Sequence, residues 1–157
     1  MSFVGSVLQI LDRVAPPRVA HAHCSIPCGL YDTAPSLMAA KTVLTMVQKI
    51  QALEVPGLNA SKEQRQQHGQ DVARMTLVKQ EHALLCRREV VDVLWAQFFK
   101  PEHLQQAPNL HDLVWGTAKL STQCSQQVNL QAAEQLVQKV QEIAAIYDKV
   151  GGQHPGR

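Results

Sequence analysis

The chain has 157 residues, a length typical of one domain and sufficient to bury a hydrophobic core. Hydrophobic residues make up 45% of it, charged residues make up 18%, and the formal net charge is +2. This balance is ordinary for a soluble globular protein and gives no case for binding nucleic acid or an anionic membrane. No apolar run reaches the ~18 residues that a membrane-spanning helix needs, so we expect no membrane segment.

Residues 1–22 have the pattern of a leader. The stretch "FVGSVLQILDRV" has apolar residues at helical spacing, and Pro16 and Pro17 end it. The segment finishes in Ala-His-Ala, which resembles a small-x-small cleavage site after Ala22. It lacks the basic start of a secretory signal, and two charges interrupt its apolar stretch. We therefore predict a pro-segment that a processing peptidase removes before His23, and a cytoplasmic protein.

The densest chemistry of the chain follows in "HCSIPCGLY", residues 23–31. The three residues between Cys24 and Cys28 bring two thiolates to one side of a tight loop, and Pro27 stiffens that loop. Thiolates are soft ligands that suit copper(I), zinc, iron–sulfur clusters or nickel. Two cysteines and His23 supply only three side-chain ligands, whereas a structural zinc site needs four.

Cleavage after Ala22 would enlarge this donor set. His23 would then offer its free amine as well as its imidazole, and the amide nitrogen of Cys24 lies between the amine and the first thiolate. Together with the thiolates of Cys24 and Cys28, these atoms form a planar set of two nitrogens and two sulfurs with a possible axial imidazole. Such a tetragonal site suits nickel, and its anionic donors stabilise a higher oxidation state.

The rest of the chain predicts four amphipathic helices. The first is capped at Asp32 or Thr33 and carries an apolar stripe over Leu37, Ala40, Leu44, Val47 and Ile50. The second begins in a capping box of Ser61 and Gln64 and extends to Lys100, with an interruption expected near Gly69. The third and fourth helices begin at Asn109 and Asn129, and Gly151-Gly152 ends the fourth. We predict an all-α fold, an antiparallel four-helix bundle over 32–150, followed by a flexible tail over 151–157.

Other cysteines and histidines lie singly within helical patterns. Cys86 and Cys124 are each expected to be small buried hydrophobes rather than ligands. The four histidines of the bundle, predicted to be polar surface or capping residues, are His68, His82, His103 and His111.

Residues 23–31 resemble a known family. "HCSIPCGLY" matches the hook pattern H-C-x-x-P-C-x-x-Y of nickel-containing superoxide dismutases, directly after a leader that family members also carry. "LWAQFFKPEH" is similar to the family segment that ends the second helix, and "PNLHDLV" follows it with the expected Leu-His. The resemblance spans roughly Ala22 to Val150. It implies a homohexamer of four-helix bundles in which each hook docks near a neighbouring subunit.

The resemblance also implies roles for single residues. His23 would provide the amine and the axial imidazole, Cys24 its amide nitrogen and thiolate, and Cys28 the second thiolate, for one nickel ion per subunit. Pro27 would shape the loop, Tyr31 would stand over the open face of the metal, and Lys100 would help to hold the hook. The implied reaction converts superoxide to dioxygen and hydrogen peroxide by Ni(III)/Ni(II) cycling.

The chain departs from the family pattern at three places that are not metal ligands. Ser25 follows the first hook cysteine where members often have an acidic residue, and Phe98 stands where the family often has a tyrosine. The first predicted helix has no carboxylate before Glu54, although many members carry a glutamate there that orients the axial imidazole. Metal-bound histidines usually have such an acceptor.

Two other functions fit the same residues. A metal carrier or sensor could use Cys24 and Cys28 in an uncleaved, non-catalytic helical protein. A thiol redox protein could form a disulfide between them, but the chain lacks the C-x-x-C spacing and the alternating strands and helices of thioredoxin-like proteins.

Overall fold

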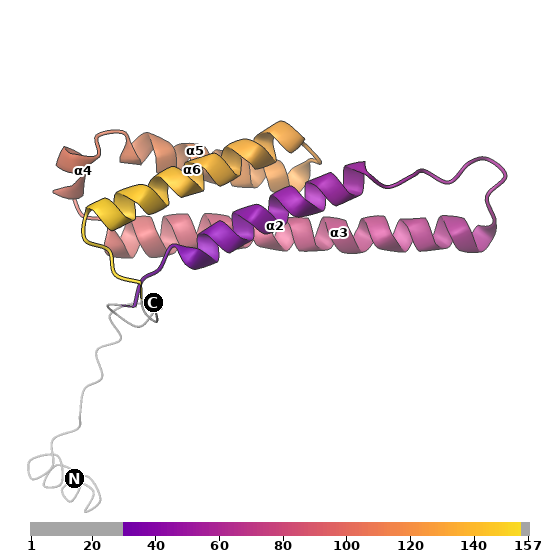
Figure 1. Cartoon of the computed structure of the whole chain (residues 1–157), viewed down its shortest axis with the longest axis horizontal. Helices are drawn as coiled ribbons and strands as arrows, with labels where there is room; N and C mark the ends of the chain where they lie inside the picture. The colour runs from indigo at the N-terminus through magenta and orange to yellow at the C-terminus, as the bar shows by residue number, and fades with distance from the viewer. Residues whose placement is uncertain (1–29, 155–157) are drawn as a thin grey trace, which may run out of the picture.

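The computed structural model describes residues 30–154, which form a bundle of four long antiparallel helices (Figure 1). The hook residues before Leu30 and the last three residues of the chain lie outside the described part. The helices in chain order are α2 (Ala34–Gln51), α3 (Lys62–Arg88) continued by a π-helix, η1 (Glu89–Phe98), the short α4 (His103–Gln106), α5 (Leu110–Gln126) and α6 (Leu130–Lys149). No residue between 30 and 154 is in a β-strand. The predicted all-α four-helix bundle is confirmed.

Helix starts follow the capping signals in the sequence, with one exception. Ser61 and Gln64 form the predicted capping box, and the Asn129 side chain accepts a hydrogen bond from the Ala132 N–H at 3.0 Å. At the start of α2 the capping acceptor is Asp32, which receives the Ala34 N–H at 2.9 Å. Asn109 precedes α5 as predicted, but its side chain makes no capping hydrogen bond.

The predicted interruption near Gly69 is wrong, because α3 continues through that residue without a break. The change in the second helix comes instead at Glu89, where the backbone widens into η1 and stays wide for 10 residues. The Phe99 N–H donates to the Leu94 carbonyl five residues back at 2.8 Å, which is the π-helical pattern. This segment places Phe98, and Lys100 two residues beyond it, at the end of the bundle where the described chain begins.

The core runs along the axis between the four long helices. Each of them contributes fully buried side chains: Ala39, Val43 and Val47 from α2, Ala83, Cys86, Val90 and Leu94 from α3 and η1, Leu110 and Cys124 from α5, and Leu136, Val140, Ile143 and Tyr147 from α6. On α2 the buried face is therefore rotated relative to the predicted stripe, and Leu37, Leu44 and Ile50 are only half-buried. The alanines allow α2 to approach its neighbours closely, while the larger leucines cover the edges of the contact.

A buried ammonium group joins α3 to the end of α5. Lys79 is 1% exposed, and its Nζ donates to the carbonyls of Cys124, Ser125 and Gln127. These are carbonyls that a helix C-terminus leaves without intrahelical partners, and the positive charge complements the negative end of the helix dipole. Burial lowers the pKa of Lys79.

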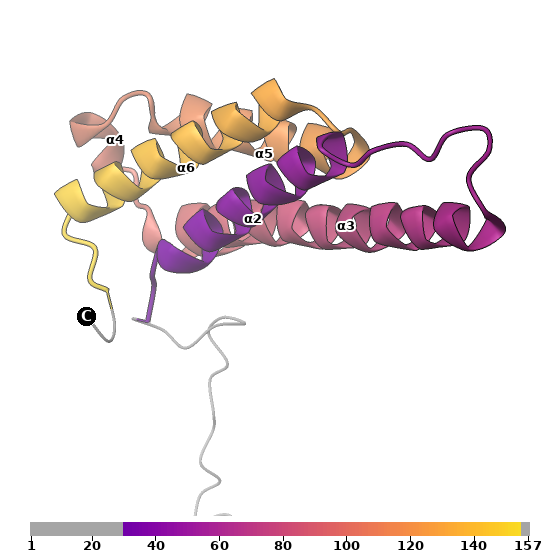
Figure 2. The ribbon, with the colours of Figure 1, turned by 45° about the vertical axis from the view of Figure 1, so that its right-hand side comes forward.

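Both ends of the described chain meet at the same end of the bundle (Figure 2). Residues 151–154, which we expected to begin a flexible tail, make hydrogen bonds to α6 and to the segment before α2. Among the helices that the structure describes, none is both long enough and apolar enough to cross a bilayer.

Candidate functional site

The segment that links the hook to the bundle, Leu30–Asp32, is called the stem here. Its Tyr31 ring packs against Phe98 of η1, with 5.7 Å between ring centroids. Phe98 in turn packs on Tyr147 of α6 at 4.4 Å, so a cluster of three aromatic rings joins the stem to two helices. The residue that the hook pattern ends on is therefore placed by the bundle, three positions after Cys28.

An open depression of about 460 Å³ lies beside this cluster. The residues that line it come from the stem, η1, the following turn and the end of α6: Tyr31, Gln97, Phe98, Lys100, His103, Tyr147, Val150, Gly151 and Gln153. Tyr31 and Lys100, which the family resemblance implied as functional residues, thus line one depression. No sequence signal pointed to Tyr147 or Gln153 as part of the same depression.

Lys100 lies on the turn that follows η1, and His103 is the first residue of α4. The Phe99 backbone is extended and Pro101 follows Lys100, which ends the helix before α4. The Lys100 N–H donates to His103 Nδ1 at 3.2 Å, which makes Nδ1 an acceptor and leaves the ring proton on Nε2. His103 also contacts the Phe98 and Phe99 rings. The sequence predicted His103 to be a polar surface or capping residue, and its side chain does accept the Lys100 backbone N–H.

No carboxylate of α2 faces this end of the bundle. The sequence of α2, Ala34–Gln51, contains no aspartate or glutamate. Asp32 of the stem and Asp148 of α6 each have a carboxylate oxygen 2.7 Å from a ring nitrogen of His154.

The predicted metal ligands lie outside the described residues. These are His23, Cys24 and Cys28, together with Pro27 and the expected cleavage site after Ala22. Between residues 30 and 154 no group of three or more histidine, cysteine or acidic side chains could hold a metal ion. Cys86 and Cys124 are buried as predicted, and burial raises their thiol pKa values to about 12 and about 11. They remain protonated at neutral pH, so they are poor metal ligands and poor nucleophiles.

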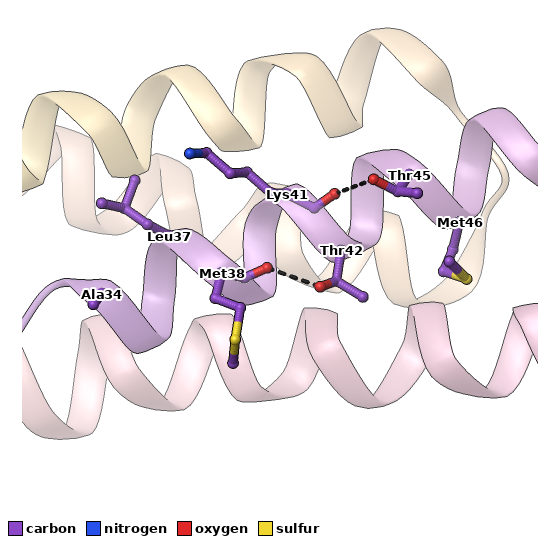
Figure 3. Close-up of a pocket in the computed structure, with 7 residues that line it drawn as sticks. All are labelled: Ala34, Leu37, Met38, Lys41, Thr42, Thr45 and Met46. Atoms are coloured by element: carbon purple, nitrogen blue, oxygen red, sulfur yellow. Dashed lines mark hydrogen bonds between the residues drawn. The ribbon is translucent and has the colours of Figure 1, made fainter.

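A second depression, of about 500 Å³, lies on the outer face of α2. Figure 3 shows Met38 and Met46 projecting from this helix with Lys41 on its other side, while Thr42 and Thr45 turn their hydroxyls to backbone carbonyls. Because those hydroxyls are already bonded, the face offers chiefly aliphatic and thioether surface. Met38 is 58% exposed.

Comparison with known proteins identifies the family of the chain. Residues 18–150 match the model of the family described as nickel-containing superoxide dismutase. The chain belongs to the nickel-containing superoxide dismutase family. It is 33% identical over 111 residues to a nickel superoxide dismutase of Streptomyces coelicolor, a match covering 70% of this chain and 74% of that protein. For a nickel superoxide dismutase of Streptomyces seoulensis the identity is 35% over 106 residues, which cover 67% of this chain and 70% of that protein.

Solved structures of nickel superoxide dismutase share the fold. The native structure superimposes with a TM-score of 0.66 at 26% identity, covering 82% of this chain and 97% of the other. A structure whose nickel ligation corresponds to the oxidised state gives a TM-score of 0.67 and also covers 82% of this chain and 97% of its own. The family match begins five residues before His23 and therefore includes the whole hook, but it ends at Val150, so residues 151–154 lie beyond it.

Proposed function

We propose that the mature chain begins at His23, binds one nickel ion in its hook and converts superoxide to dioxygen and hydrogen peroxide. The observation that carries this proposal is the position of the hook pattern. It ends on Tyr31, and the bundle places Tyr31 in the same depression as Lys100. A carrier or sensor that uses the same two cysteines would not need this arrangement of the stem.

The donor set fits nickel. His23 would supply an amine and an imidazole, Cys24 an amide nitrogen and a thiolate, and Cys28 a second thiolate. This set combines soft sulfur donors with strong nitrogen donors in a tetragonal arrangement, which suits a divalent ion of the nickel type. When bound, nickel supplies a one-electron couple whose potential the thiolates and the amide bring between the two half-reactions of superoxide.

The residues of the chain have separate tasks in this proposal. Pro27 restricts the loop between the thiolates, and Tyr31 narrows access to the open face so that small anions enter and larger molecules do not. Lys100 is exposed at the rim of the depression, where its positive charge favours the approach of superoxide and helps to hold the hook.

The assembly is proposed to be a homohexamer, formed in the cytoplasm after a peptidase removes residues 1–22. The apolar side chains exposed on α2, α3 and α5 support burial against other subunits, since Met38, Leu77 and Trp115 are each more than half exposed in the single chain. The outer face of α2 described above is one such surface.

Cysteine variants of the mature chain test the proposal. Cys24→Ser and Cys28→Ser are expected to abolish both nickel binding and the catalysed decay of superoxide, because each removes one thiolate from the metal. Cys124→Ala is the matched control, since it removes a buried thiol from the end of α5 and should leave nickel content unchanged. Nickel binding that survives in both hook variants would refute the proposed ligands.

A further inference from the structure

The chain makes a tight turn at the end of α6 that requires glycine. Gly151 has a φ of +86°, a conformation that other residues rarely adopt. Its N–H donates to the Asp148 carbonyl at 3.2 Å, and the Gly152 N–H donates to the Tyr147 carbonyl at 2.9 Å. This pair of bonds is the Schellman motif. It directs residues 152–154 across the end of the bundle towards the stem (Figure 2).

Gly152 lies directly on the ring of Tyr147. A Cβ added to Gly152 would be 2.2 Å from Cε1 of that ring, so no larger residue fits without displacing the segment or the ring. The hydroxyl of the fully buried Tyr147 lies 2.8 Å from the Tyr31 carbonyl and 2.6 Å from the Gln153 carbonyl. Burial raises the pKa of Tyr147, so the hydroxyl stays protonated as a donor between the stem and the C-terminal segment.

His154 lies between two carboxylates. Its Nδ1 is 2.7 Å from Asp32 of the stem, and its Nε2 is 2.7 Å from Asp148 of α6. Ionised carboxylates only accept hydrogen bonds, so both ring nitrogens must carry protons and the imidazole is a cation. The His154 side chain is only 16% exposed, so solvent screens its charge less than it screens the charges of a surface ion pair.

We propose that Gly151–His154, called the strap here, positions the stem and through it Tyr31 and the nickel hook. Tyr147 and His154 act as positioning residues, because they hold the backbone of Tyr31 and the side chain of Asp32 rather than the metal. The strap lies beyond the residues that match the family model, which end at Val150. Its effect on the metal rests on the proposed function, since the stem leads into the hook.

Two variants release the strap without substituting any residue of the aromatic cluster. Gly152→Ala displaces the strap by collision with the Tyr147 ring, and His154→Gln removes the cation between the two carboxylates. His154→Lys is the conservative variant, because its ammonium keeps the charge and has enough donors for both carboxylates. His111→Gln is the matched control, since that histidine lies on α5 with 67% of its side chain exposed.

The first readout is amide hydrogen exchange at residues 31–34 in the nickel-free mature protein. Losing one charge-assisted hydrogen bond corresponds to about tenfold faster exchange of these amides, because it lowers the free energy of local opening by about 1.4 kcal/mol. We expect this acceleration in Gly152→Ala and His154→Gln, and rates near those of the unaltered chain in His154→Lys and His111→Gln. Unchanged exchange in both release variants would overturn the proposal, whether or not the chain binds nickel.

The second readout is the rate of nickel dissociation from the loaded protein, measured together with the electron paramagnetic resonance spectrum of the oxidised metal. A strap that positions the hook predicts several-fold faster dissociation and a broadened or shifted spectrum in the release variants, with partial rescue in His154→Lys. Faster exchange combined with unaltered dissociation and spectrum would overturn the positioning role, because the strap would then hold the stem without affecting the hook. Absence of nickel from the unaltered chain would count against the proposed function instead, and the exchange result would stand separately.

Discussion

Lys79 provides the sharpest test of how the bundle is held together. Its ammonium group is buried between α3 and the end of α5 and donates to three backbone carbonyls. Substitution by methionine keeps much of the side-chain volume but leaves those carbonyls without their donor. Each hydrogen bond from a charged donor contributes about 1.5–3 kcal/mol, and desolvation of the ammonium offsets part of the total. We therefore expect Lys79→Met to lower the free energy of unfolding by about 2–4 kcal/mol.

The assay is calorimetric unfolding of the unaltered and variant proteins at one protein concentration, so that assembly contributes equally. For a domain of this size a loss of that order lowers the melting temperature by about 10 °C. Lys79→Gln, which keeps an N–H donor, should lose less than Lys79→Met. Lys62→Met changes an exposed lysine at the start of the same helix and serves as the control. A melting temperature for Lys79→Met within about 1 °C of the control would refute this account of the buried lysine.

The remaining predictions concern pH, thiols, a glycine and the rim of the depression. Burial lowers the pKa of Lys79 below its usual 10.5, so between the folded-state pKa and pH 10.5 the unfolded chain binds more protons than the folded chain. The free energy of unfolding of the unaltered protein, relative to that of Lys79→Met, should therefore increase as the pH rises through that interval. Urea unfolding at several pH values checks the sign of this change. Cys86 and Cys124, with pKa values of about 12 and about 11, should resist iodoacetamide at pH 8 in the folded protein and react after unfolding. Mass spectrometry of labelled peptides checks this, and labelling of either thiol in the folded protein would contradict it. Gly69→Ala should stabilise the protein by about 0.5–1 kcal/mol, because Gly69 lies inside α3 and no atom lies within 4 Å of an added Cβ. Thermal unfolding checks this, and a loss of stability would mean that the glycine has a role that the single chain does not show. Lys100→Gln should slow catalysed superoxide decay and flatten its dependence on ionic strength, and a pulse-radiolysis rate with unaltered salt dependence would contradict the proposed attraction.

Local signals in the sequence were sufficient to predict the bundle. The capping box at Ser61, the cap at Asn129 and the glycine pair after α6 all depend on residues within one turn of each other, and each has its predicted place. The buried face of α2 was predicted less well, because Leu37, Leu44 and Ile50 are more hydrophobic than Ala39 and Val43. Close helix packing selects small side chains at the contact, and a hydrophobic pattern does not reveal which neighbour a helix will approach.

The elements that sequence reasoning missed depend on long-range contacts. Gly69 suggested an interruption because glycine weakens helices, yet the break in α-helical geometry comes at η1, where no glycine or proline stands. His154 meets Asp32 across 122 positions of the chain, and Lys79 meets the end of α5 across 45, so neither pairing has a local signature. For the candidate site, the family resemblance indicated Tyr31 and Lys100, while the contributions of His103, Tyr147 and Gln153 appear only once the helix ends are brought together.

We propose that a chain beginning at His23 forms a nickel site that the uncut chain cannot form. The most direct measurement compares residues 1–157 with residues 23–157 after equal exposure to nickel, with intact mass, nickel content and superoxide decay determined on the same samples. The account predicts about one nickel ion per chain and catalysed decay only when the amine of His23 is free, because that amine completes the donor set. Equal nickel binding by both chains, or a trimmed chain that binds none, would contradict it.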